Sequence, residues 1–380
     1  MNDAVIVAAA RTPVGKRNGA LSSVHPADLS AHVLDALVAR TGIDPVTVDD
    51  VIWGCVSQIG EQTFDIARTA VLSAGWPESV PGTTVDRQCG SSQQALHFGA
   101  AGLVAGHYDT VVVGGVESMS RIPMGSAAAT GNPLGRRYVE RYGVDFPNQG
   151  IGAEMIAEQW NLSRRQLDEF ALMSHERAAA AVDKGLFADE IAPVEVDGVL
   201  VSADEGIRRG GTVEALGALR SAFRDDGRVT AANASQISDG AAALLMMTSE
   251  AAARAGLRPL ARVHTAAVAG TAPMPMLTGP IPATRKVLAR AGLTLDDIGV
   301  YEVNEAFASV VLAWAAEFGA DLSRVNPRGG AIALGHPLGG SGARLATTML
   351  HHMRDQNIRY GLQTMCEGGG QANATVIELL

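Results

Sequence analysis

Apolar and polar residues form blocks along the first third of the chain, and these blocks predict strands and helices in turn. Short runs rich in valine and isoleucine, at residues 5–10 and 111–115, indicate buried strands. Residues 27–40 and 64–74 carry apolar side chains at helical spacing. Because strands that alternate with helices are typical of βαβ units, this pattern predicts an α/β fold with a mainly parallel sheet.

The same blocks return 250 residues later. Residues 37–43 resemble residues 287–293, and each segment precedes an aspartate pair and an apolar run. The Gly-Ser-Ser at residues 90–92 stands the same distance before the Gly-Ser-Gly at residues 340–342. Two landmarks with one offset indicate two tandem copies of one fold.

Residues 120–238 lie between the copies and differ in character. A capping box, Ser163 to Gln166, predicts one helix, which ends near Gly185. Arginines gather in this segment, and they indicate either a solvated face or a site for a phosphate-bearing ligand. They are Arg136, Arg137, Arg141, Arg208, Arg209, Arg220, Arg224 and Arg228.

Domain boundaries follow from the repeat and the inserted segment. The first copy is expected at residues 1–119, with residues 239–258 completing it, because the apolar run at 241–247 predicts a strand that returns to its sheet. The inserted unit is expected at 120–238 and the second copy at 259–380. Residues 267–282 are rich in proline and glycine and predict a loop.

Composition narrows the class of protein. A net charge of −10 argues against nucleic acid as the main partner, and no apolar run reaches the roughly 20 residues of a membrane span. Three widely spaced cysteines predict no disulfide framework and favour a reducing cytoplasm. No CxxC motif or His/Cys cluster predicts a metal site.

Candidate chemistry begins at Cys89, between a predicted strand at residues 82–85 and a predicted helix. A thiol at a helix N-terminus loses its proton more easily and becomes a nucleophile. Gly90 is expected to allow a tight turn there. The alternative is that Cys89 is a small buried hydrophobe, as we expect for Cys55.

Three stretches of the second copy also carry candidate groups. Asn304 follows a predicted strand, where it is either an active-site hydrogen-bonding group or a helix N-cap. His336 lies in the glycine-rich segment 329–342, whose glycines predict close backbone approach, and it is either a base or a buried structural histidine. Cys366 precedes three glycines, 368–370, and offers a thiol acid beside exposed N–H groups.

These motifs together resemble the thiolases, and the likeness covers essentially the whole chain. The motifs are VDRQCGSS around Cys89, NEAFA at Asn304, GGAIALGHPLGGSG around His336 and CEGGG at Cys366. The resemblance implies a thiolase-like five-layer αβαβα fold, built from two tandem βαβαβαββ halves with an inserted loop domain that binds coenzyme A.

The resemblance also implies roles for the site residues. Cys89 would attack the 3-keto carbon of a 3-ketoacyl-CoA, His336 would take its proton, and Cys366 would protonate the departing acetyl-CoA enolate. One oxyanion hole would use His336 and a water held by Asn304. The other would use the backbone N–H groups of Cys89 and Gly368.

Binding residues and partners follow from the same resemblance. Arg208 would contact a CoA phosphate, Ser235 the pantetheine, and Phe307 the acyl group. CoA is expected as a substrate, with no permanently bound cofactor and no nucleic-acid or membrane partner. A homodimer or homotetramer is implied.

Some positions depart from the common thiolase pattern. Asp86 stands where many thiolases have Asn, and it would oppose thiolate formation unless a group such as Arg87 pairs with it. Asn148-Gln149 replace the His-Met typical of the acetoacetyl-CoA branch. The variants at residues 86–88 (Asp-Arg-Gln) and 235–238 (Ser-Gln-Ile-Ser) are similar to those of degradative actinobacterial thiolases, some of which act on steroid side chains. The alternatives are a biosynthetic acetoacetyl-CoA thiolase, a ketoacyl-synthase-type condensing enzyme and an inactive lipid-CoA binding protein.

Overall fold

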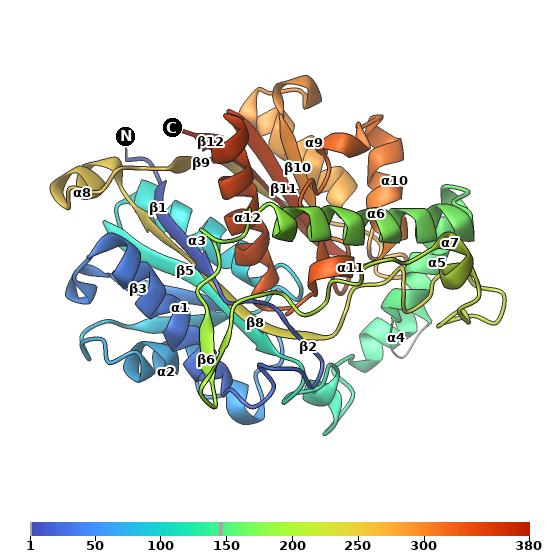
Figure 1. Ribbon diagram of the computed structural model, residues 1–380, viewed down its shortest axis with the longest axis horizontal. Coiled ribbons are helices and arrows are strands. Elements are labelled where there is room, and N and C mark those ends of the chain that lie inside the picture. Colours follow the sequence, from blue (N-terminus) through green and yellow to red (C-terminus); the bar gives the residue numbers. More distant parts are fainter. Residues whose placement is uncertain (1, 144–146) are drawn as a thin grey trace.

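The computed structural model describes residues 2–143 and 147–380, whose longer strands join into one mixed sheet (Figure 1). Its strand order is β4-β3-β5-β8-β1-β9-β12-β11-β10, with β2 paired to β8, while β6 and β7 form a separate hairpin. The strands are β1 (Val5–Arg11), β2 (Gly15–Lys16), β3 (Asp50–Gly54), β4 (Gly82–Val85), β5 (Thr110–Ser118), β6 (Val194–Val196), β7 (Val199–Val201), β8 (Ser238–Met247), β9 (Ala261–Gly270), β10 (Val300–Val303), β11 (Tyr360–Glu367) and β12 (Gln371–Leu379).

The helices cover this sheet and carry the inserted segment. They are α1 (Pro26–Thr41), α2 (Ile66–Ser73), α3 (Ser91–Ala105), α4 (Arg136–Tyr142), α5 (Gln149–Gln159), α6 (Arg164–Asp183), α7 (Val213–Gly217), α8 (Ser249–Arg254), α9 (Pro280–Ala291), α10 (Ala308–Phe318), α11 (Ala331–Leu334) and α12 (Ser341–Gln356).

The sheet consists of two halves that meet at one short pairing. β1 pairs with β9 over only two residue pairs, Val5 with Arg262 and Ile6 with Ala261. Parallel pairing occurs between β3 and β4, β3 and β5, and β10 and β11, and the other neighbours are antiparallel. The prediction of a mainly parallel sheet is therefore wrong, because each half ends in a return strand, β8 or β12, that runs opposite to its neighbours.

The tandem repeat is confirmed element by element. β3 and β10 begin at residues 50 and 300, α3 and α12 at 91 and 341, and β5 and β11 at 110 and 360. Helices α1 and α9 end at left-handed glycines, Gly42 and Gly292, which close each helix with a backbone N–H bond. The counterpart of β4 is reduced to an isolated bridge between Tyr301 and Val325.

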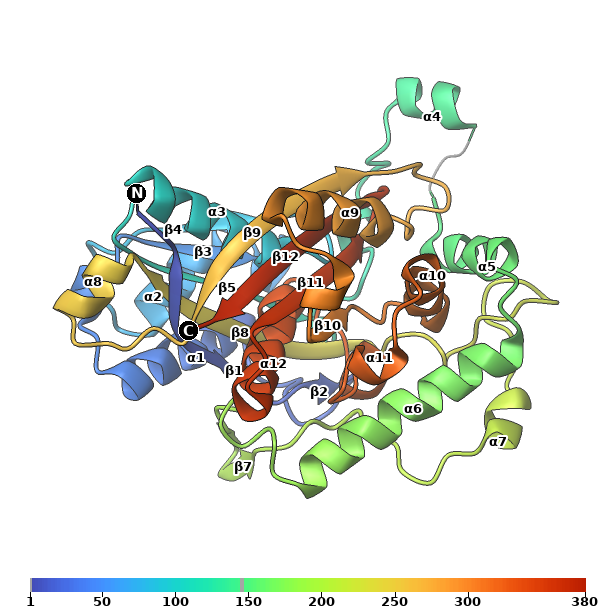
Figure 2. The same ribbon diagram turned by 90° about the horizontal axis from the view of Figure 1, so that it is seen from above.

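Five layers result from this arrangement, as expected (Figures 1 and 2). Helices α1 and α2 pack on the outer face of the first half of the sheet, and α9 and α10 pack on the outer face of the second. Helices α3 and α12 lie in contact between the halves and share a core with strands of both. The two central helices are largely buried because sheet lies on both sides of them.

Glycines allow the two central helices to approach closely. A Cβ on Gly342 would lie 2.3 Å from the backbone nitrogen of Gln93, and one on Gly339 would lie 2.3 Å from the carbonyl oxygen of Val116. Real Cβ atoms do not come this close to backbone, so neither position accepts a side chain. The close approach predicted from the glycine-rich segment is confirmed, and much of it is to the other half of the chain.

The inserted segment holds α4–α7 and the β6–β7 hairpin. Helix α6 begins at the predicted capping box of Ser163 and Gln166, whereas α4, α5, α7 and the hairpin were not predicted. The predicted loop at 267–282 is also too long, since β9 continues to Gly270 and α9 starts at Pro280, where proline suits a first helical turn. No helix of the described chain is both long and apolar enough to cross a membrane.

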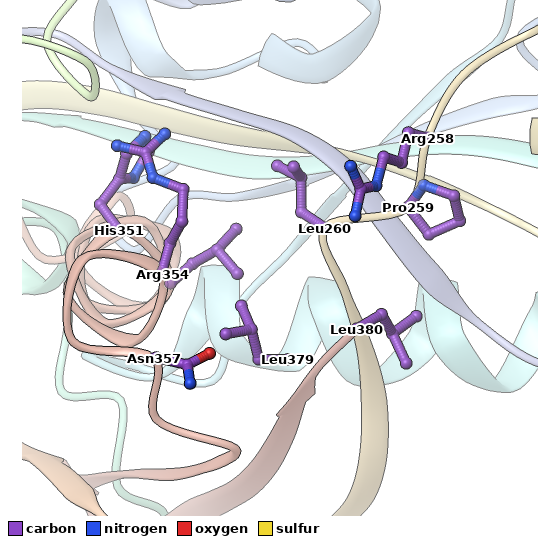
Figure 3. A pocket seen from close by; sticks show the side chains of 9 residues that line it. Arg258, Pro259, Leu260, His351, Arg354, Asn357, Leu379 and Leu380 are labelled. Atoms are coloured by element: carbon purple, nitrogen blue, oxygen red, sulfur yellow. The ribbon is translucent and has the colours of Figure 1, made fainter.

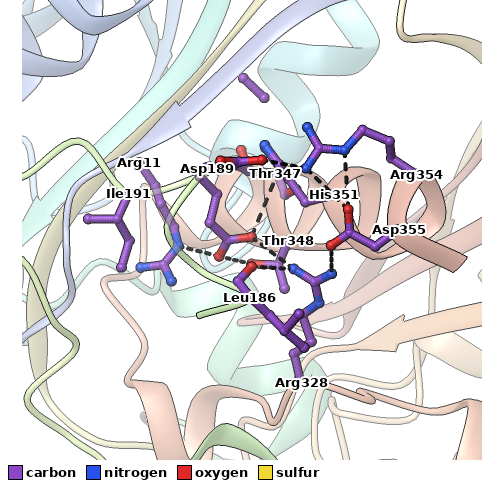
Figure 4. A network of polar contacts seen from close by, with 12 residues as sticks. Arg11, Leu186, Asp189, Ile191, Arg328, Thr347, Thr348, His351, Arg354 and Asp355 are labelled. Carbon is purple, nitrogen blue, oxygen red and sulfur yellow. Dashed lines mark hydrogen bonds and ion pairs between the residues drawn. The ribbon is translucent and has the colours of Figure 1, made fainter. Parts of the chain in front are cut away.

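A buried ion network ties β1 to the inserted segment (Figure 4). Arg11 donates Nε to Glu190 at 2.7 Å and Nη1 to Asp204 at 2.7 Å, and all three side chains are fully buried. Arg328, close to α11, approaches the same Glu190 carboxylate at 3.9 Å. The network therefore connects the first half, the inserted segment and the second half.

Candidate active site

The turn that carries Cys89 joins β4 to α3. Gln88 adopts a left-handed backbone with φ of 49°, and its N–H donates to Asp86 Oδ1 at 2.6 Å. Gly90 has φ of −88°, so the expectation that Gly90 makes the tight turn is wrong. Gly90 is required for space instead, because a Cβ there would lie 1.9 Å from Glu367 Oε1.

Asp86 finds its hydrogen-bond donors within the same turn. The backbone N–H of Gln88 and, more distantly, its side-chain amide donate to the carboxylate. Arg87 donates to Gln371 Oε1 at 2.9 Å and forms no ion pair with Asp86, although its charge lowers the pKa of that carboxyl. Burial raises the pKa of Asp86, and the Gln88 donors partly oppose that shift.

Cys89 is a neutral thiol in this structure. The side chain is 5% exposed, and burial, followed by the charge of Glu367, raises its pKa to about 12. The backbone N–H groups of Cys89 and Gly368 act in the opposite direction, so both donors point toward Sγ. The expectation that this position makes the thiol lose its proton more easily is therefore wrong, and a base is needed.

His336 provides a neutral imidazole. Asn304 Nδ2 lies 3.3 Å from His336 Nε2, and an amide NH₂ can only donate, so Nε2 is the acceptor nitrogen. The ring proton is then on Nδ1, which donates to Ser341 Oγ at 2.6 Å, while that hydroxyl donates to the Pro337 carbonyl. Burial, aided by the charge of Arg344, lowers the pKa of His336 to about 3.

Asn304 follows β10 directly, and its backbone N–H donates to the Thr364 carbonyl at 3.0 Å. It does not cap a helix, because α10 begins at Ala308 with Phe307 at the N-cap position. Asn304 Oδ1 is buried and has no hydrogen-bond partner among the described residues. A buried amide oxygen of this kind is suited to hold a water or a ligand donor.

Cys366 lies near the end of β11 and is almost fully buried. Burial, followed by the charge of Cys89, raises its pKa well above the usual range. The structure therefore does not give Cys366 a pKa near 7. Gly369 and Gly370, with φ of 80° and 79°, make the hairpin turn to β12, which leaves Gly368 beside Gln88.

Ser235 and Phe307, the residues predicted to contact the pantetheine and the acyl group, lie on segments that are side by side. The Ser235 N–H donates to the Ala306 carbonyl at 2.9 Å, and Ala234 bridges to Phe307. Phe307 is 8% exposed, and its ring lies edge-on to Phe223 with centroids 6.0 Å apart. The end of the inserted segment therefore meets the loop that carries Asn304.

Arg208 lies elsewhere, in a pocket of about 300 Å³ against α6. Its backbone N–H donates to His175 Nδ1 at 3.1 Å, while its guanidinium forms no hydrogen bond or ion pair with any described residue. None of the other predicted site residues lines this pocket. Arg209, which lines the same pocket, pairs with Asp183, and Arg224 of the inserted segment pairs with Glu158.

A second pocket, of about 310 Å³, opens beside the last residues of the chain (Figure 3). Arg258, Leu260, Arg354 and Leu380 are among its lining residues, and no predicted site residue is. It therefore plays no part in the candidate active site.

Sequence reasoning assigned no role to three polar residues of the site. Ser341 fixes the His336 tautomer, and Glu367 and Asn373 converge on Gly90. The repeat contained a signal for two of them, because Ser341 and Glu367 stand 250 residues after Ser91 and Glu117. Asn373 had no such signal.

Comparisons with known proteins agree with this geometry. The family model described as "Thiolase, N-terminal domain" matches residues 4–250, and "Thiolase, C-terminal domain" matches residues 257–379. The chain is 52% identical over 388 residues to the steroid 3-ketoacyl-CoA thiolase FadA6 of Mycobacterium tuberculosis, covering 100% of this chain and 95% of that protein. It is 48% identical over 389 residues to the 3-ketoacyl-CoA thiolase of Erwinia tasmaniensis, covering 100% of both.

A solved structure shares the architecture. The acetyl-CoA acetyltransferase of Bacillus anthracis superposes with a TM-score of 0.91 at 38% sequence identity. The superposition covers 100% of this chain and 99% of that one.

Proposed function

The chain belongs to the thiolase family, and on that basis we propose that it cleaves a 3-ketoacyl-CoA with free CoA, releasing acetyl-CoA and a shortened acyl-CoA. The protein is thus an acyltransferase. One observation carries the choice of reaction: the segment with a second thiol, Cys366, packs against the Cys89 turn, since the next two residues, Glu367 and Gly368, lie against Gly90 and Gln88. A ketoacyl synthase uses a cysteine nucleophile without that second thiol.

Cleavage begins at Cys89. His336 Nε2 takes the proton from Sγ, and the thiolate attacks the 3-keto carbon of the substrate. The bond between C2 and C3 breaks, and its electron pair stays on C2 of the departing acetyl-CoA. The Cys366 S–H gives its proton to C2, and the shortened acyl group remains as a thioester on Cys89.

Transfer to CoA restores the enzyme. The Cys366 thiolate takes the thiol proton of free CoA, and the CoA sulfur attacks the thioester carbonyl. Cys89 leaves as a thiolate and recovers its proton from His336. The imidazole thus ends neutral, the form in which burial holds it.

Two oxyanion holes serve these steps. Asn304 Nδ2 contacts His336, and the buried Asn304 Oδ1 is suited to accept from a water. Both observations support a site formed by His336 and a water that Asn304 holds. The N–H groups of Cys89 and Gly368 both point toward Sγ, which supports a second site there. One well-placed donor to an oxyanion stabilises the transition state by roughly 3–4 kcal/mol.

Residues 120–238 form the CoA-binding unit in this proposal, inserted in a first half that residues 239–258 complete. The guanidinium of Arg208 has no partner among the described residues, so it is suited to bind a phosphate. Ser235 is suited to contact the pantetheine and Phe307 the acyl chain. Free CoA enters as a substrate and leaves as the shortened acyl-CoA.

The names of the relatives favour degradation of a 3-ketoacyl-CoA larger than acetoacetyl-CoA, including a steroid side chain. Asn148-Gln149 also depart from the His-Met of the acetoacetyl-CoA pattern, and the Asn148 side chain instead caps α5 by accepting from the N–H groups of Gly150 and Ile151. A biosynthetic acetoacetyl-CoA thiolase is the second candidate, because a structural neighbour is named acetyl-CoA acetyltransferase.

We also propose that the enzyme is a homodimer or homotetramer in the cytoplasm. β4 is an edge strand, and beside it Phe64 is 89% exposed and Leu72 is 47% exposed, which suits an interface with a second copy. The three cysteines are free thiols, as a reducing compartment requires.

Product analysis tests the reaction. The protein is incubated with CoA and 3-ketoacyl-CoAs of increasing bulk, from acetoacetyl-CoA to a steroid side-chain thioester, and acetyl-CoA is measured. We expect release that is fastest with the bulkier substrates, and a fall of about 10³-fold or more in Cys89→Ala. Cys55→Ala is the matched control, since Cys55 is also a buried free thiol but has no assigned role.

Intact mass without added CoA tests the intermediate. One acyl group should remain on the wild type and on Cys55→Ala, and none on Cys89→Ala. Acylation at Cys366 would reverse the assigned roles of the two thiols. No acetyl-CoA from any substrate would refute the thiolase proposal.

A further inference from the structure

Glu367 lies behind the nucleophile with no hydrogen-bond donor. It stands between Cys366 and Gly368, its side chain is fully buried, and neither carboxyl oxygen has a partner among the described residues. The carboxyl oxygen Oε1 approaches Gly90 so closely that a Cβ there would lie 1.9 Å away. A buried carboxylate without donors is unfavourable, so its protonation state needs explanation.

Asn373 turns its amide oxygen to the same place. The amide nitrogen donates to Gln94 Oε1 at 3.2 Å and lies 3.3 Å from His97 Nδ1. Burial lowers the pKa of His97 to about 3, so its Nδ1 can accept while Nε2 contacts Thr375 Oγ1 at 2.7 Å. With both amide hydrogens used, Asn373 Oδ1 lies 2.3 Å from the same Cβ position on Gly90 and has no donor.

Two acceptor oxygens, Glu367 Oε1 and Asn373 Oδ1, therefore converge beside Gly90. Two acceptors repel unless a proton lies between them. A protonated carboxyl is a donor, and its hydroxyl would satisfy Asn373 Oδ1. In its assigned orientation the Asn373 amide directs its hydrogens to Gln94 and His97 and not to the carboxyl.

The tandem repeat contains a carboxyl at the same position with the opposite surroundings. Glu117, 250 residues before Glu367, accepts hydrogen bonds from the N–H groups of Val56, Ser57 and Gly339 and from Gln62. Gly339 is itself the counterpart of Cys89. The Gly339 N–H therefore donates to the Glu117 carboxylate. The corresponding N–H of Cys89 does not donate to Glu367, so it can donate to the substrate oxyanion.

We propose that Glu367 is a positioning residue that stays a neutral carboxylic acid, with its hydroxyl donated to Asn373 Oδ1, and that loss of this proton suppresses thiolate formation at Cys89. The inference rests on the proposed role of Cys89 as nucleophile. Neutral Glu367 holds the turn at Gly90 without adding a negative charge beside Sγ. Ionised Glu367 adds that charge and opposes both the thiolate and the oxyanion.

The charged neighbours of Glu367 agree with this assignment. Burial raises its pKa to about 9, and Asp86 raises it further. The charge of Arg87 lowers it, as does the backbone N–H of Asn373, which acts on the carboxyl without making a full hydrogen bond to either oxygen. Cys89 and Cys366 also face it, since its charge raises the pKa of each thiol. Arg87 is held by Gln371 and forms no ion pair with Glu367.

Alkylation of Cys89 by iodoacetamide tests the proposal without any substrate. The thiolate displaces iodide, so the rate follows the thiolate fraction, which rises tenfold per pH unit below the thiol pKa. In the wild type this rise should flatten above about pH 9, where Glu367 ionises. In Glu367→Gln, which keeps a donor but carries no charge, the rise should continue, with rates within about 3-fold of wild type at pH 7 and about 10-fold higher at pH 10.

Glu302→Gln is the matched control, because Glu302 is also buried, its carboxyl oxygens have no hydrogen-bond partner in the part of the chain that the structure describes, and burial raises its pKa to about 8. It should leave the wild-type profile unchanged. A wild-type profile that rises tenfold per unit to pH 10, or parallel profiles for wild type and Glu367→Gln, would overturn the proposal. The wild-type profile alone decides if the variant does not fold.

Thermal unfolding gives a second measure. A carboxyl whose folded pKa is about 9 binds its proton more tightly in the folded state, so it lowers stability as pH rises from about 4.5 to 9. Glu367→Gln should therefore gain more in Tm relative to wild type at pH 8 than at pH 5. An equal difference at both pH values would contradict a neutral Glu367. Absence of acetyl-CoA release alongside the expected alkylation profile would refute only the proposed reaction.

Discussion

At the scale of single residues, the site is a set of uncharged groups. Cys89, Cys366 and His336 each have a pKa shifted by burial toward the neutral form. Charge would therefore form during the reaction, at Sγ and at the substrate oxygen, where N–H donors point. A neutral resting site also limits unwanted reactions of the thiols, since only the thiolate is a strong nucleophile.

The pH dependence of catalysis follows from His336. Because its pKa is lowered to about 3, it remains an unprotonated base from pH 8 down to pH 5. We expect kcat/KM for acetyl-CoA release to show no fall with a pKa near 6.5 in that range. Steady-state kinetics at saturating CoA measure this. A fall near pH 6.5 with every substrate contradicts a buried neutral His336.

At the scale of elements, the crossing of α3 and α12 sets the geometry of the site. Cys89 lies just before the N-cap of α3, and His336 precedes α12 by a few residues, so the contact between these helix N-termini positions the proposed nucleophile and the proposed base. Ser92 Oγ accepts from the Ala343 N–H at 2.9 Å across this contact. Small residues on both helices permit it.

Gly342→Ala should disrupt this crossing. Its Cβ would lie 2.3 Å from the Gln93 nitrogen, a backbone atom that cannot move without shifting α3. We expect a loss of about 1–3 kcal/mol in unfolding free energy, together with reduced kcat, because the two catalytic turns separate. Urea denaturation and acetyl-CoA release measure the two effects.

Gly217→Ala is the control for that substitution. Gly217 ends α7, and a Cβ there meets nothing within 4 Å. Its stability and activity should match wild type or rise slightly, as expected when alanine replaces glycine in a helix. Equal behaviour of the two alanine variants would show that close approach at Gly342 is unimportant.

At the scale of the whole molecule, the buried network around Glu190 joins parts that are distant in sequence (Figure 4). Arg11 comes from β1, Glu190 and Asp204 from the inserted segment, and Arg328 from the second half. Burial lowers the pKa of Arg11, but the two carboxylates raise it by more, so the net shift is upward. The charge of Arg11 is thus secured by its partners.

Arg11→Met should be strongly destabilising, because it leaves two buried carboxylates without their main partner. A loss of about 3–5 kcal/mol in unfolding free energy is expected. The midpoint of guanidinium denaturation measures it, and limited proteolysis of the inserted segment shows whether that unit detaches first. Arg209→Met is the control, since its pair with Asp183 is exposed and should contribute nothing measurable.

Local patterns in the sequence predicted much of the architecture. The first half's strands and helices, the tandem copies and the capped helix α6 were found because each depends on residues close along the chain. The strand at 241–247, now β8, was also found, but the antiparallel direction of β8 and β12 was not, because strand direction depends on distant pairing partners. Helix α9 was partly hidden by prolines that suit its first turn.

For the site, the sequence by itself determined which groups are present: Cys89, Asn304, His336 and Cys366, in two copies of one fold. Only the tertiary structure decided how those groups are protonated and paired. The neutral Cys89, the His336 tautomer and the donor-free Glu367 depend on burial and on neighbours up to 279 residues apart. Desolvation and hydrogen bonding depend on residues that are close in space, so a pattern along the chain does not predict these protonation states or partners.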